Sequence, residues 1–185
     1  MKELSLNILD IAKNSVTAGA TCITVSVTET PDRLTITVSD NGCGMTPEFV
    51  ARVTDPFTTT RTTRKVGLGI PLLKMEAQQS GGDLAIESQV GVGTTTSAWF
   101  DPGSIDMPPL GDLAASVLTL IQGSPDIQWI FTHSAGGEHY TLDTREIREI
   151  MGDISLAEPE ILAWLSEFLS ENETALRAAS ANTSI

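Results

Sequence analysis

Cysteine is scarce in this sequence, and long apolar runs are missing altogether. The only cysteines are Cys22 and Cys43, and neither belongs to a CxxC pair or a Cys/His cluster. This excludes a disulfide framework and argues against a structural zinc site. No apolar run approaches the roughly 18–20 residues that a membrane helix needs. The N-terminal stretch MKELSLNILDIAKNS contains Asn7 and Asp10 where an export signal would be apolar. We therefore expect no export signal, no membrane span and a cytoplasmic location.

Basic residues are also scarce. The chain has 11 Lys and Arg against 24 Asp and Glu, a net charge of −13. This charge argues against binding nucleic acids or acidic lipids through their phosphates. It is unevenly spread, because residues 1–100 carry a net −2 and residues 101–185 a net −11. The asymmetry indicates two parts with different roles. The acidic part would suit a basic partner, or it simply keeps the protein soluble.

The spacing of apolar residues predicts an alternation of helices and strands. Residues 3–18 form a helix, because Leu4, Ile8 and Ile11 recur on one face. Strict alternation predicts an antiparallel hairpin of two strands. The remaining pattern predicts a short helix, a polar loop, and a helix followed by two strands. The ranges in chain order are 22–30, 33–40, 47–53, 54–66, 67–82, 83–89 and 94–100.

A segment with three prolines and two glycines, residues 101–111, predicts a domain boundary. We expect a first domain over 1–101, a linker over 102–111 and a small acidic α+β unit of unknown role over 112–185. In that unit, hydrophobic patterning predicts a helix, a hairpin and two further helices. These elements span residues 112–123, 127–143, 144–153 and 158–180.

Glycine pairs carry the strongest chemical signal. One pair follows Asp40 at a strand end, in the segment DNGCG, and a second, in GLG, opens the helix that starts near residue 67. A third pair, Gly91 and Gly93, opens another strand. A glycine pair at a helix N-terminus lets a phosphate approach the backbone N–H groups. A strand-end aspartate can accept a hydrogen bond from an exocyclic amine such as that of adenine. Each motif alone has a simpler interpretation, since GLG is a common loop and DNG an ordinary turn.

Asp10 and Asn14 lie four residues apart and therefore share one face of the first helix. A carboxylate and an amide on that face could hold Mg²⁺ or orient a water molecule. A solvated helix face is the alternative interpretation of the same pair.

The ordered series of motifs resembles the ATP-binding domain of sensor histidine kinases. This domain belongs to the GHKL superfamily, together with the DNA gyrase, heat-shock chaperone and mismatch-repair ATPases. The resemblance covers about residues 5–101. It implies an α/β sandwich of the Bergerat type, with a mixed sheet covered by helices on one face, followed here by a small C-terminal α+β appendage. It also implies ATP and Mg²⁺ as ligands. The motifs that carry it are Asn14, SDNGCGM, DPF, GLGI, GGDLAIES and GVGTTT.

The resemblance assigns roles around the base and the metal ion. Asn14 would hold Mg²⁺ between the phosphates. Asp40 would bind the adenine amino group, with Gly42 and Gly44 making room for the base. Either of two neighbouring hydroxyl residues, Thr94 or Thr95, would sit near the adenine.

Further roles concern the phosphates and the lid over them. The helix start would cradle phosphates, Lys65 would add positive charge, and Phe57 would anchor the ATP lid. The residues at the helix start are Gly67, Leu68 and Gly69. Asp10 lies where hydrolysing relatives keep a glutamate base, and it is one methylene shorter.

Two departures from the kinases shape the expected function. Only a few residues precede the first helix, so we expect no segment carrying a phosphorylated histidine. The two histidines, His133 and His139, are expected on the surface of a hairpin. A kinase-type signalling module that acts on a protein partner is therefore the leading hypothesis. The alternatives are a slow ATPase switch of the mismatch-repair kind, with Asp10 as base, and a non-catalytic nucleotide-sensing or anti-sigma-type regulator. A homodimer is left open.

Overall fold

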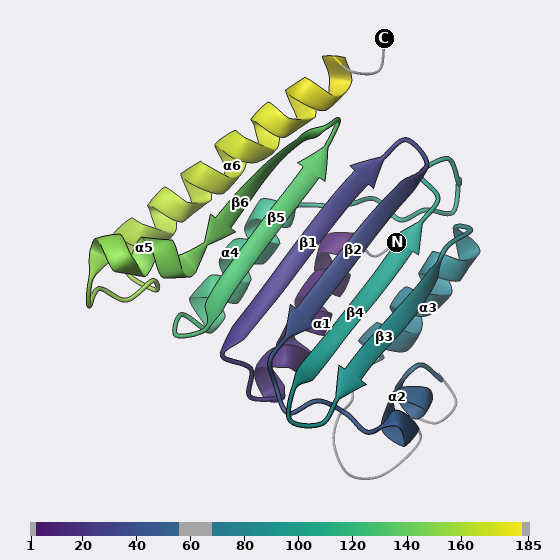
Figure 1. Cartoon of the computed structure of the whole chain (residues 1–185). Coiled ribbons are helices and arrows are strands. Elements are labelled where there is room, and N and C mark those ends of the chain that lie inside the picture. Colours follow the sequence, from purple (N-terminus) through teal and green to yellow (C-terminus); the bar gives the residue numbers. More distant parts are fainter. Residues whose placement is uncertain (1–2, 56–67, 183–185) are drawn as a thin grey trace.

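The structure, a computed structural model, describes residues 3–55 and 68–182 (Figure 1). Its elements follow the predicted order closely. The helices are α1 (Leu4–Thr17), α2 (Pro47–Val53), α3 (Gly69–Gln79), α4 (Leu113–Gly123), α5 (Thr144–Met151) and α6 (Pro159–Asn182). The strands are β1 (Cys22–Thr30), β2 (Arg33–Asp40), β3 (Asp83–Gln89), β4 (Gly93–Phe100), β5 (Gln128–Ala135) and β6 (Glu138–Asp143).

The strands form one mixed sheet in the order β3-β4-β2-β1-β5-β6, so β3 and β6 are its edges. All neighbouring strands are antiparallel except β1 and β5, which run parallel in a register that pairs Val25 with Phe131. A parallel pair needs a crossover connection. Here everything from β2 to α4 lies between the two strands in sequence. The mixed sheet confirms the predicted fold class.

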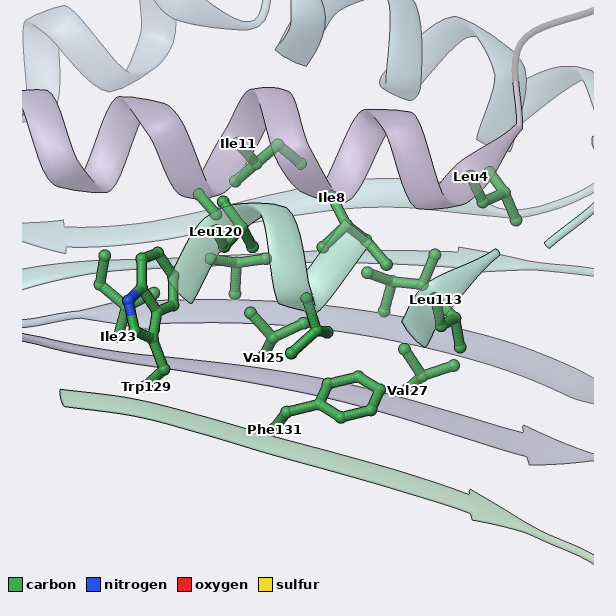
Figure 2. Packing of buried hydrophobic residues seen from close by; sticks show 14 of the residues in the cluster. Leu4, Ile8, Ile11, Ile23, Val25, Val27, Leu113, Leu120, Trp129 and Phe131 are labelled. Atoms are coloured by element: carbon green, nitrogen blue, oxygen red, sulfur yellow. The ribbon is translucent and has the colours of Figure 1, made fainter. Parts of the chain in front are cut away.

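One face of the sheet packs against the helices and forms the core. On β1 and β5 the buried positions alternate, as the period of two requires. Figure 2 shows these side chains meeting apolar residues of α1 and α4. The labelled contributors are Ile23, Val25, Val27, Trp129 and Phe131 from the strands, and Leu4, Ile8, Ile11, Leu113 and Leu120 from the helices. The helices α1, α3 and α4 lie on the same side of the sheet in Figure 1.

Strands from both sides of the predicted domain boundary share this sheet and this core. The segment before α4 also returns to the N-terminus, where Pro109 and Leu110 accept backbone hydrogen bonds at 2.9 Å from Leu4 and Ser5. The division into residues 1–101 and 112–185 therefore stays a proposal about roles within one sheet. None of the helices in residues 3–55 and 68–182 has the length and apolar content that crossing a bilayer requires.

Replacing Phe131 tests whether the β5 side chains stabilise the whole chain. Phe131→Ala removes a side chain that is 1% exposed, and we expect the free energy of unfolding to fall by about 3–5 kcal/mol. Urea denaturation followed by tryptophan fluorescence measures the change. The matched control is Ile105→Ala, at a position 96% exposed, which should change stability by less than about 0.5 kcal/mol. A loss no larger than that of the control would contradict the shared core.

Candidate functional site

Asp40, at the end of β2, is held in place from two directions. The Ser15 hydroxyl of α1 donates to Asp40 Oδ2 at 2.5 Å, and the Gly42 N–H donates to Oδ1 at 2.8 Å. Ser15 is buried, so this contact ties the strand end to the covering helix. A carboxylate offers about four acceptor positions. The oriented Asp40 carboxylate can therefore still accept hydrogen bonds from a ligand.

Glycines let three backbone segments approach one another around Asp40. A Cβ added at Gly42 would lie 2.9 Å from Ala18 Cβ, and one at Gly44 would lie 2.0 Å from the Gln89 carbonyl oxygen. A Cβ added at Gly93 would lie 1.9 Å from the Asp40 carbonyl oxygen. Gly44 and Gly93 also have positive φ, which favours glycine. The end of α1, the DNGCG segment and the β3–β4 turn thus meet at this point.

Asp10 and the start of α3 come together on the helix side of the sheet. A Cβ added at Gly69 would meet Asp10 Cβ at 3.2 Å and Oδ2 at 3.7 Å. Among the described residues, no side chain caps the helix start at Leu68, and the first turn of α3 contains no acidic residue. Leu68 itself is exposed. Uncapped N–H groups at the positive end of a helix dipole suit an anion such as phosphate.

The remaining predicted positions divide into three groups. Asn14 lies on α1 four residues after Asp10, and its side chain is half-buried. Thr94 pairs with Asp40 across β4 and β2, so their side chains share the helix-covered face. Thr95 points to the opposite face, where its hydroxyl bonds to that of Ser39 at 2.8 Å. Phe57, Lys65 and Gly67 lie outside the described residues.

Sequence reasoning assigned no role in the site to two residues that shape it. Ser15 continues the buried face of α1 after Ile11 and Ala12, and that spacing was the available signal. Gly93 stands in the GVG segment, but its contact with Asp40 depends on how β4 pairs with β2. Within the part of the chain that the structure describes, no three His, Cys, Asp or Glu side chains gather in a way that could hold a metal ion.

A second polar cluster surrounds His133, away from Asp40. The expectation of a surface histidine is wrong here: His133 is 1% exposed, whereas His139 is exposed as predicted. His133 occupies an inward position of β5, two residues after Phe131. Its Nδ1 bonds to Glu173 Oε1 at 2.8 Å and its Nε2 to Glu29 Oε1 at 2.7 Å. The Tyr140 hydroxyl donates to the same Glu173 Oε1 at 2.5 Å.

These contacts shift the pKa values of the cluster. Burial alone would lower the pKa of His133, but the hydrogen bonds to Glu173 and Glu29 outweigh it and raise this pKa to about 9. Burial favours the neutral form of Glu173, yet its bonds from His133 and Tyr140 hold the carboxyl pKa below its usual value. Burial and the neighbouring Glu173 carboxylate raise the pKa of Tyr140. At neutral pH the cluster therefore holds a protonated imidazole between two carboxylates.

Stability should depend on pH through this cluster. The charge of His133 contributes fully to the stability of the folded state below the ordinary histidine pKa of 6.5. This contribution is lost as the pH rises through about 9. The contribution of Glu173 is present above its ordinary pKa of 4.5 and is lost as the pH falls. Urea denaturation at a series of pH values should show that the free energy of unfolding declines from pH 6.5 to 9. The slope should correspond to about one more proton bound in the folded than in the unfolded state. His133→Gln should lower stability and flatten this slope, while His139→Gln should do neither. If the stability of His133→Gln and of His139→Gln varied with pH in the same way, the pH dependence would not come from His133.

Comparison with known proteins identifies relatives of the N-terminal part. The family model described as histidine kinase-, DNA gyrase B-, and HSP90-like ATPase matches residues 1–104. The probable C4-dicarboxylate sensor kinase of Bacillus subtilis (strain 168) is 35% identical over 78 residues, which are 42% of this chain and 15% of that protein. The histidine protein kinase DivJ of Caulobacter vibrioides is 34% identical over 101 residues, 52% of this chain and 17% of that protein. This chain thus spans only a small part of the length of these relatives.

The fold also has a counterpart among solved structures. The crystal structure of the N-terminal domain of a DNA repair protein matches with a TM-score of 0.53 and 14% sequence identity, over 83% of this chain and 58% of that one. At this identity the likeness concerns the fold alone. The family model covers more than half of the chain, in the order α1, β1, β2, α2, α3, β3, β4. The chain therefore belongs to the family of histidine kinase-, DNA gyrase B-, and HSP90-like ATPases.

Proposed function

We propose that this chain binds ATP with Mg²⁺ and acts as a kinase-type signalling module on a protein partner. Membership of the family implies ATP binding, and the kinase relatives indicate the histidine-kinase type of domain. The observation that carries the proposal is the geometry of Asp40. Its carboxylate is oriented by Ser15 and Gly42 and keeps acceptor positions for an exocyclic amine such as that of adenine.

The phosphates belong at the start of α3 in this proposal. The helix start at Leu68, which no side chain of the described residues caps, and the exposure of Leu68 suit a polyphosphate. Asn14 is the amide that would hold Mg²⁺, and hard oxygen ligands are what this ion prefers. Bound Mg²⁺ would supply charge neutralisation at the phosphates. The chain's own contribution is positioning, which dominates catalysis of phosphoryl transfer.

The acceptor is proposed to lie on the partner. His133 is enclosed by Glu29 and Glu173 with both ring nitrogens hydrogen-bonded, so it does not present a nucleophile. The acidic residues 101–185, with a net charge of −11, would attract a basic partner surface. A cytoplasmic location is part of the same proposal.

Hydrolysis with a conformational output is the second candidate, and one contact favours it. Asp10 lies against Gly69, at the helix start where the phosphates are proposed to bind. A carboxylate in that place is within reach of a water near the terminal phosphate. The same geometry without turnover would make the chain a nucleotide-sensing regulator of the anti-sigma type.

Nucleotide binding should depend on the Asp40 carboxylate. Asp40→Asn turns one acceptor oxygen into a donor that faces the adenine amine, so ATP affinity measured by calorimetry with Mg²⁺ should fall at least about tenfold. Asp106→Asn, at an exposed position beyond β4, removes the same charge and should leave the affinity unchanged. Equal ATP affinity in the wild type and Asp40→Asn would overturn the proposed site.

Asp10 separates the two candidate functions. If Asp10 is a general base, Asp10→Asn should lower phosphate release at least about a hundredfold while ATP affinity changes little. In a kinase-type module or a pure regulator, the variant should bind ATP and show the same slow background of phosphate release as the wild type. A coupled phosphate-release assay beside calorimetry measures both quantities. If Asp10→Asn hydrolysed ATP at the wild-type rate, the hypothesis of an ATPase switch with Asp10 as general base would be wrong.

A further inference from the structure

A cavity of about 910 Å³ lies beside the His133 cluster and is separate from Asp40. Glu29, at the far end of β1, lines it, whereas Asp40 pairs with Ile23 near the beginning of that strand. The other walls come from the start of α4, the second half of α6 and the residue before α1. The cavity is therefore a feature of its own, built mainly where the two halves of the chain meet.

Two glycines show that these walls are closely fitted. Gly111 has φ +79°, and a Cβ there would lie 2.4 Å from both Glu3 Oε2 and Ser5 Oγ. Gly136 has φ +61°, and a Cβ there would lie 2.7 Å from Ser180 Cα. The segment before α4 therefore lies directly against residues 3 and 5, and α6 lies directly against the β5–β6 turn. The walls of the cavity are thus closely packed at both places.

Glu173 lines this cavity and has a buried, unsatisfied acceptor. It is 7% exposed, and its Oε1 receives hydrogen bonds from both His133 and Tyr140. Its Oε2 is buried and has no hydrogen-bond partner among the described residues. A buried carboxylate oxygen without a donor is costly. A ligand in the cavity that brings an N–H group to Glu173 would remove this cost once the carboxylate turns Oε2 toward it.

The charged residues around the cavity determine which sign of charge a ligand can carry. Among the described residues that line it, four carry carboxylates, and these are opposed by His133 and Arg177. The carboxylates belong to Glu3, Glu29, Asp112 and Glu173. Both ring nitrogens of His133 are already engaged, so the cluster offers no free imidazole to a metal ion. The surplus of negative charge favours a cation that donates hydrogen bonds and disfavours an anion.

The rest of the lining is apolar. Leu113, Ala135 and Leu176 are buried side chains that border the cavity. A ligand that matches both surfaces carries an ammonium group on a short hydrocarbon chain, since the chain can contact these residues while the ammonium reaches the carboxylates. We propose that this cavity is a binding site for a small protonated aliphatic amine, with Glu173 as its main acceptor.

Calorimetric titration of the full chain with putrescine, without ATP, tests the proposal. We expect putrescine to bind, and butanediol and succinate, which have the same chain length, not to bind. Glu173→Gln should weaken putrescine binding about tenfold, because it removes one charge-assisted hydrogen bond. Absence of putrescine binding to the wild type would overturn the proposal.

Two further variants keep the test decisive if Glu173→Gln fails to fold. Asp112→Asn removes a cavity charge but keeps an oxygen to accept from the Ala115 N–H at the start of α4. It should weaken putrescine binding about threefold, as loss of one neighbouring charge at partial screening implies. Glu149→Gln, on the exposed side of α5, lowers the total charge equally and should have no effect. Equal weakening by both variants would show a general charge effect and would reject the site.

Discussion

Strand β1 has backbone hydrogen-bonding groups along both edges, and buried groups of this kind must be paired. Its antiparallel partner β2 follows at once in the sequence, but its parallel partner β5 lies about a hundred residues further on. That pairing joins the acidic second half to the half that matches the ATPase family. It also brings Trp129 and Phe131 over the same helices that cover Val25. The core and the cavity beside His133 both depend on it.

The proposed nucleotide site depends on the same sheet through shorter contacts. Asp40 is the last residue of β2, and its orientation comes from Ser15 on α1 and from the Gly42 N–H. Because α1 is fixed by its apolar face, the helix acts as a rigid support for both Ser15 and Asp10. Packing far from the ligand therefore sets the direction of the groups that would bind it.

Local features of the fold were predictable from the sequence, and distant pairings were not. The spacing of the apolar residues in α1 and their alternation in β1 directly predict which side chains are buried. No local sequence pattern of this kind indicates that β5 is the neighbour of β1. The burial of His133 could have been predicted, because His133 continues the alternation of Trp129 and Phe131. Histidine is polar, however, so the apolar pattern by itself ended at Phe131. The contact of Gly93 with Asp40 required the register of β4 on β2.

The two edges of the sheet have a consequence for association between molecules. Among the described residues, β3 and β6 each have only one neighbouring strand. Both carry carboxylates, Asp83 and Glu87 on one and Glu138 and Asp143 on the other. A strand of a second copy added at either edge would bring these like charges together, which opposes growth of the sheet into longer assemblies. The sheet thus ends in electrostatic barriers that disfavour polymerisation by strand addition.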